Sequence, residues 1–188
     1  HDALPICFVE SVKAFPDNLN VRANLTFSPP DIPGSLPSVA DQRYVSLSVH
    51  YSFARLPAQP MTPRIDDDRI GFLNLTKQDL SSGAADFIVR YANRWRLEPE
   101  SAAGEKMKPR RPIVFYIDPS IPDEFRTLIK EGVEIWQQAF AAAGWYQAVR
   151  AEPLPKGADP EDLRYPTIRW DVGHSGIRGS TLLTTDPR

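Results

Sequence analysis

The residues that could perform metal-dependent or acid–base chemistry are few and scattered. Zinc needs clustered ligands, because the ion exchanges its water shell for several protein donors at once. The three histidines, His1, His50 and His174, are spread along the 188 residues, and no H-E-x-x-H motif is present. His174 lies near Asp171 in "DVGHSG" and is interpreted as a loop histidine with local hydrogen bonds. A hydrolase that uses His174 with Asp171 or Asp186 stays open as an alternative, and no metal ligand is assigned.

Nucleophilic catalysis also lacks its usual pattern. Ser175 lies in "GHSGIRG", but a nucleophile elbow of the form G-x-S-x-G needs glycine where Ile177 stands. Cys7 has apolar neighbours and is interpreted as a small core residue rather than a reactive thiolate. As the only cysteine, it also excludes an internal disulfide and a multi-cysteine zinc site. No catalytic residue is therefore assigned.

Charge and hydropathy narrow the classes of partner. The formal net charge is −2, so a nucleic-acid partner is not expected, although arginine and aromatic residues alternate in "RYANRWRLE". No apolar run approaches the roughly 20 residues that span a bilayer. Asp66, Asp67 and Asp68 form an acidic turn in "PRIDDDRIG", which lacks the distal glutamate of a calcium-binding EF-hand loop.

Strands are expected to dominate the first hundred residues. In "NVRANLTFS", Val21, Ala23, Leu25 and Phe27 alternate with polar residues, as in a half-buried strand. "RYVSLSVHYSFARL" alternates in the same way, and shorter strands are expected in "RIGFLNLT" and "DFIVRYANRWRLEP". Their spacing, with polar turns between them, predicts antiparallel pairing.

The second half predicts a mixed α/β unit. "PIVFYI" is an apolar run typical of a buried central strand. A long helix should follow, with Ser120 as its N-cap, Asp123 completing a capping box, and Gly144 just after its end. Phe125, Trp136 and Phe140 are expected to pack in the core, along a helical stripe of apolar residues. Two more strands are expected in "YQAVRAEPL" and "YPTIRWDVG".

The predicted fold class is α+β, with an antiparallel β-rich upstream domain followed by a β-α-β-β unit. The expected division is residues 1–100 for the β-rich domain, 101–110 for a polar linker, and 111–188 for the mixed unit. The chain begins with His1 rather than methionine, so a piece of a longer precursor is expected.

Five blocks in sequence order resemble a family of large bacterial zinc-dependent metalloproteases of the metzincin type. Three of them, "VSLSVHYSFARLP", "MTPRIDDDRIGFLN" and "NRWRLEP", resemble the upstream domain of unknown function in that family. "RPIVFYIDPSIPDEFRTLIKEGVEIWQQAFAAAGW" and "DPEDLRYPTIRWDV" resemble the entry to its peptidase domain. The resemblance implies an incomplete metzincin-like N-terminal subdomain over residues 111–188, truncated before the H-E-x-x-H zinc motif. It also implies a periplasmic or secreted protein.

The same resemblance implies roles for two segments in the intact protein. Ser180, Thr181, Leu182, Leu183 and Thr184 would form the cleft edge strand and bind substrate, or simply complete the sheet. Asp66–Asp68 would hold the zinc of a latent enzyme, or remain a solvated turn. The resemblance implies that the intact parent protein binds zinc and that this chain binds none.

The expected function is therefore the non-catalytic portion of a zinc peptidase, inactive by itself. Its expected partners are the remainder of the peptidase domain and a peptide or protein substrate. The alternative is a non-enzymatic β-rich binding or surface module.

Overall fold

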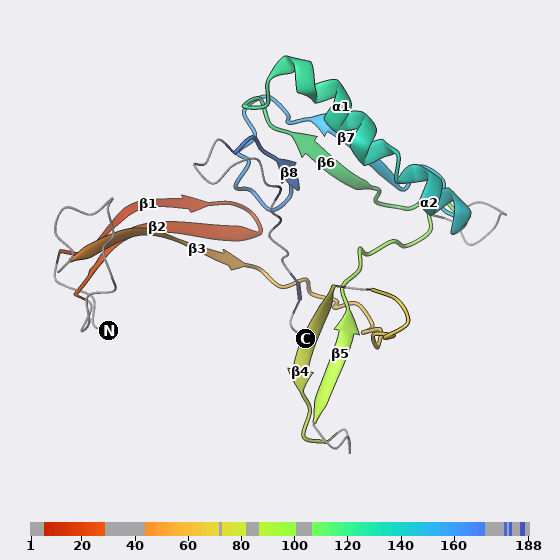
Figure 1. The fold of residues 1–188 in the computed structure, drawn as a ribbon, viewed down its shortest axis with the longest axis horizontal. Helices are drawn as coiled ribbons and strands as arrows, with labels where there is room; N and C mark the ends of the chain where they lie inside the picture. The colour runs from red at the N-terminus through yellow and green to blue at the C-terminus, as the bar shows by residue number, and fades with distance from the viewer. Residues whose placement is uncertain are drawn as a thin grey trace. The chain divides into compact units, whose positions relative to one another are not determined.

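The computed structural model describes residues 6–28, 44–71, 73–81, 87–100 and 107–171, with residues 179, 181, 185 and 186. The fold is mixed α+β with a β-rich character (Figure 1). The chain forms two compact units, one of His1–Arg55 with Gly157–Arg164 and the other of Leu56–Lys156 with Tyr165–Arg188. The elements are β1 (Phe8–Ala14), β2 (Asn18–Phe27), β3 (Val45–Ala54), β4 (Asn74–Gln78), β5 (Ile88–Ala92), β6 (Ile113–Ile117), α1 (Asp123–Glu134), α2 (Gln137–Ala142), β7 (Val149–Pro153) and β8 (Thr167–Ile168).

The first unit is built on an antiparallel sheet in the order β1-β2-β3. Val21 pairs with Tyr51 and Ala23 with Val49, so the alternating apolar residues of β2 and β3 share one face, as the sequence predicts. This face is largely open, since the exposed fraction is 51% for Leu47 and 60% for Phe53. The other face carries Asn, Ser, Thr and charged residues at the intervening positions.

A two-stranded antiparallel sheet, β4-β5, begins the second unit. Antiparallel pairing is confirmed, but these strands form a sheet separate from β1-β2-β3. β4 begins at Asn74, later than expected, and Phe87 precedes β5 with a φ of 53°. The division between compact units falls at Arg55, whereas composition predicts a linker at residues 101–110, of which 101–106 lie outside the described residues.

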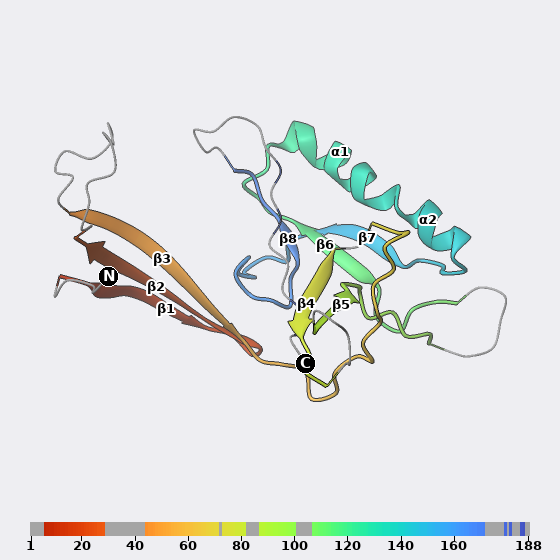
Figure 2. The ribbon, with the colours of Figure 1, turned by 60° about the horizontal axis from the view of Figure 1, so that its bottom comes forward.

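The second unit also contains a parallel sheet in the order β7-β6-β8, so "PIVFYI" does supply the central strand. Figure 2 shows α1 and α2 running along β6 and β7. The core beneath α1 consists of Ile117, Ile121 and Ala151, against which the partly buried Phe125, Ile129, Val133 and Ile168 pack. This is an ordinary strand–helix–strand crossover, in which the helix covers one face of the sheet.

The predicted start of the helix is wrong. α1 begins at Asp123 after Pro122, and no side chain caps it. Ser120 lies two residues before the N-cap position, Pro122, and its N–H, which a capping box would direct to Asp123, donates to the Asp118 carboxylate at 2.7 Å, in a turn at the end of β6. The aspartate provides an alternative acceptor that the capping pattern does not take into account.

The predicted single helix is interrupted at Ile135 and Trp136, which separate α1 from α2. Trp136 is 62% exposed, so its expected core position is wrong, whereas Phe125 packs against the core and Phe140 is half-buried. Gly144 ends the helical region with a φ of 84°, as predicted for a residue that needs a left-handed conformation.

Candidate functional site

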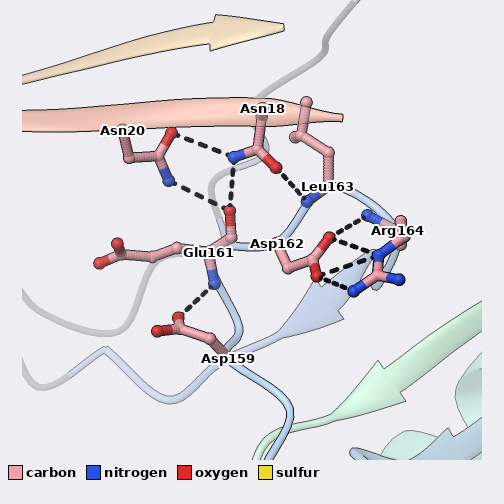
Figure 3. Close-up of polar contacts among 7 residues, drawn as sticks. All are labelled: Asn18, Asn20, Asp159, Glu161, Asp162, Leu163 and Arg164. Atoms are coloured by element: carbon pink, nitrogen blue, oxygen red, sulfur yellow. Dashed lines mark hydrogen bonds and ion pairs between the residues drawn. The ribbon is translucent and has the colours of Figure 1, made fainter. Parts of the chain in front are cut away.

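The most organised polar cluster of the first unit lies between β2 and the segment Gly157–Arg164 (Figure 3). Asn18 and Asn20 are two residues apart on β2, so their side chains leave the same face of the sheet. Each residue is only 5% exposed. Buried amides need hydrogen-bond partners, because an unsatisfied polar group in the interior is costly.

The two asparagines hold the backbone of the later segment. Both side-chain Nδ2 groups donate to the carbonyl oxygen of Glu161, at 2.9 Å from Asn18 and 3.1 Å from Asn20. The N–H of Leu163 donates to Asn18 Oδ1 at 3.1 Å, and Asn18 also donates to Asn20 Oδ1 at 3.2 Å. Asn18 therefore uses both ends of its amide to fix the segment on either side of Asp162, as Figure 3 shows.

Charged side chains surround these bonds. Lys13 Nζ lies 2.8 Å from Asp159 and 3.2 Å from Glu161, and Arg22 lies 3.6 Å from Glu161. The hydrogen bond to Asp159 raises the pKa of Lys13, although partial burial acts in the opposite direction. The lysine side chain is 44% exposed, so this ion pair adds little stability compared with the buried amides.

The segment is also organised internally. Asp162 is 3% exposed, and its carboxylate accepts hydrogen bonds from the N–H and the guanidinium of Arg164. The Arg164 guanidinium, with the Arg164 amide, holds the pKa of Asp162 below its usual value despite burial. Asp159 accepts the N–H of Glu161 at 2.9 Å. The hydrogen bonds of Asn18 and Asn20, together with those inside the segment, make this cluster an anchor that holds Gly157–Arg164 on β2.

The three consecutive aspartates Asp66–Asp68 differ in their hydrogen bonding and exposure. Asp66 accepts hydrogen bonds from the N–H of Asp67 at 2.9 Å and from Asn74 Nδ2 at 2.7 Å. Asp67 pairs with the Arg69 guanidinium at 2.6 Å, and this hydrogen bonding lowers the pKa of Asp67. Asp68 is exposed. Over the described part of the chain, no group of three or more His, Cys, Asp or Glu side chains is arranged to hold a metal ion.

The other predicted positions are only partly described. Thr181 is exposed and in no helix or strand, whereas Ser180, Leu182, Leu183 and Thr184 lie outside the described residues. His174 and Ser175 also lie outside them, so a hydrolase that uses His174 with Asp171 or Asp186 stays an untested alternative. His50 lies on β3 and is exposed.

Sequence reasoning missed the anchor. Its one visible signal is the pair of asparagines in "NLNVRANLTF", on the face of the strand opposite the apolar residues. Their partner Glu161 is 143 residues from Asn18, and the partner atom is a backbone carbonyl, which leaves no trace in side-chain types.

Residues 6–100, just over half of the 188-residue chain, match the family described as "Domain of unknown function (DUF5117)". No curated protein and no solved structure matches the chain. In the described residues, no helix has the length and apolar character needed to cross a membrane. The family match includes β1 to β5 but not the segment Gly157–Arg164, which completes the first unit. The chain belongs to the family of domains of unknown function DUF5117.

Proposed function

We propose that this chain is a non-catalytic portion of a zinc-dependent metallopeptidase, which hydrolyses peptide bonds in the intact protein. The observation that carries the proposal is the β6-α1-α2-β7-β8 order over the blocks that resemble the entry to a metzincin-like peptidase domain. In that interpretation the parallel sheet and its covering helices support a cleft whose zinc and general base come from elsewhere in the parent. There, zinc would activate the attacking water and polarise the scissile carbonyl.

Two segments have proposed roles in the parent. Residues 180–184 would pair with the backbone of a peptide or protein substrate by strand addition, and the described Thr181 is exposed, which suits that role. The aspartates Asp66–Asp68 would bind the zinc of the latent enzyme. Asp68 is the best placed of the three to do so, because it is exposed and the carboxylates of Asp66 and Asp67 already have partners. The remainder of the peptidase domain is the proposed partner, in a periplasmic or secreted protein.

A second candidate function is a non-enzymatic β-rich binding module. It is favoured by one observation, the open apolar face of the β1-β2-β3 sheet, where Val9, Val12 and Phe53 are each more than half exposed. Monomeric proteins rarely expose a large contiguous apolar patch, and such a patch often marks a surface that binds another molecule.

A peptide hydrolysis assay distinguishes the peptidase role from the binding module. This chain and the protein encoded by the complete gene are each incubated with a mixture of quenched fluorescent peptides, with and without a zinc chelator. The proposal predicts chelator-sensitive hydrolysis by the complete protein and none by the chain. A complete protein that is inactive at every zinc concentration tested would favour the binding module, and chelator-insensitive hydrolysis by this chain would favour the His174 alternative.

A further inference from the structure

The outer edge of β3 is a regular, uncharged strand without a partner strand among the described residues. β3 lies at one end of the order β1-β2-β3 and pairs with β2 over ten residues without a register shift. Its sequence VSLSVHYSFA contains no lysine, arginine, carboxylate, proline or glycine. Natural sheets usually protect such an edge, because its free N–H and C=O groups can pair with another chain.

The opposite edge of the same sheet has this protection. The pairing of β1 with β2 shifts between Val9 and Ser11, so Glu10 forms a bulge. Lys13 adds a charge to β1 and is engaged with Asp159 and Glu161. Bulges and charges both oppose the addition of a further strand. Of the two edges of this sheet, β3 is therefore the one that has neither a bulge nor a lysine, arginine or carboxylate.

Hydrogen-bond alternation shows which backbone groups of β3 are available. The N–H of Arg55 donates to the carbonyl of Asp17 at 2.7 Å, immediately after the paired residues Ala54 and Asn18. Antiparallel pairs alternate between bonded and non-bonded positions, so odd-numbered residues of β3 direct their backbone groups toward β2. The even-numbered residues, Ser46, Ser48, His50 and Ser52, therefore direct theirs outward.

We propose that β3 pairs in antiparallel fashion with β3 of a second copy of this chain, about a two-fold axis at Val49. In this register Val49 lies opposite its own counterpart, Leu47 opposite Tyr51, and Val45 opposite Phe53. All of these side chains share the apolar face, so aliphatic and aromatic residues meet across the interface. The outward groups of Ser46, Ser48, His50 and Ser52 supply the hydrogen bonds.

A second copy fits this edge because the strand is complementary to itself. No ionised carboxylate, lysine or arginine of β3 meets a like charge when two copies pair, so repulsion does not oppose the contact. The resulting six-stranded sheet ends at two bulged β1 strands, which stops growth at the dimer. The inference is independent of the proposed peptidase role.

Cysteine cross-linking tests the pairing and its register. Val49 would occupy a non-hydrogen-bonded pair with Cα atoms about 4.5 Å apart, within the range of a disulfide. In a Cys7→Ser background, Val49→Cys should give a covalent dimer under mild oxidation. Val12→Cys, on the protected edge and 58% exposed, is the matched control and should stay monomeric. Mixing Leu47→Cys with Tyr51→Cys should cross-link far more than either alone.

Sedimentation equilibrium of the unmodified chain supplies the second readout. The chain should sediment at twice the monomer mass, and Val49→Lys should shift it to monomer while Val12→Lys does not. A monomeric unmodified chain, or equal cross-linking from Val12 and Val49, would overturn the proposal. Val49→Cys that forms a covalent complex only with another protein, and never with a second copy of this chain, would also overturn the proposal. If Val49→Lys fails to fold by circular dichroism, the near-isosteric cysteine variants still decide.

Discussion

Asn18 is the residue on which the anchor of the first unit depends most. Its amide both donates to Glu161 and accepts from Leu163, and it is 5% exposed. Asn18→Ala removes the acceptor of the Leu163 N–H and one of the two amide donors to the Glu161 carbonyl, which costs about 1–3 kcal/mol. Urea unfolding should show this loss. Asn24→Ala, at a half-buried position of the same strand, is the control and should cost clearly less. Equal losses would contradict the assigned role.

The buried carboxylates make stability depend on pH in a definite direction. The Arg164 guanidinium lowers the pKa of Asp162. Burial acts to raise the pKa of Asp118, but the Ser120 hydrogen bonds and the nearby Arg169 outweigh it and lower that pKa. A carboxylate with a lowered folded-state pKa stabilises the protein above its unfolded pKa of about 4, and this stability is lost as pH falls through the folded value.

Thermal unfolding between pH 7 and about pH 3 checks this dependence. The midpoint should fall on acidification, and Asp162→Asn should reduce the size of that fall, because the substituted group no longer binds a proton. A fall of the same size in Asp162→Asn and in the unmodified chain would show that Asp162 does not contribute.

At the scale of elements, α1 packs against the sheet through one face of the helix. Phe125 packs on the core, and its ring stacks on that of Trp170 with 5.2 Å between the ring centroids, whereas Trp136 is 62% exposed. Phe125→Ala should therefore cost about 2 kcal/mol or more, and Trp136→Ala less than about 1 kcal/mol. Guanidinium unfolding monitored by far-ultraviolet circular dichroism measures both. A larger loss from Trp136→Ala would mean that the packing face is wrongly assigned.

Periodicity predicts elements well here and their ends poorly. The alternation in β2 and β3 and the apolar run of β6 identify strands, because the face that a side chain occupies follows directly from its position. The start of α1 could not be predicted from Ser120, because the Asp118 carboxylate accepts the N–H that a capping box would direct to Asp123, and the helix begins only after Pro122. The anchor could not be predicted either, because Asn18 binds a carbonyl far away in the sequence. The expected metzincin-like subdomain stays a prediction.

At the scale of the whole molecule, the first unit is built from two stretches of chain that lie far apart in the sequence. Its sheet uses β1 to β3, and Gly157–Arg164 supplies the anchoring backbone. Replacing residues 158–163 with a glycine–serine linker of equal length should speed amide exchange in β2, while β6 and β7 stay protected. Hydrogen exchange with mass spectrometry measures each strand separately. Unchanged exchange in β2 would show that the sheet is complete without the segment.

Zinc content and peptide hydrolysis of the purified chain, measured together after zinc loading and dialysis, test the non-catalytic role most directly. The proposed function predicts no stoichiometric zinc and no hydrolysis by this chain, with chelator-sensitive hydrolysis by the complete gene product under the same conditions. Stoichiometric zinc in this chain, accompanied by hydrolysis that a chelator abolishes, would contradict it.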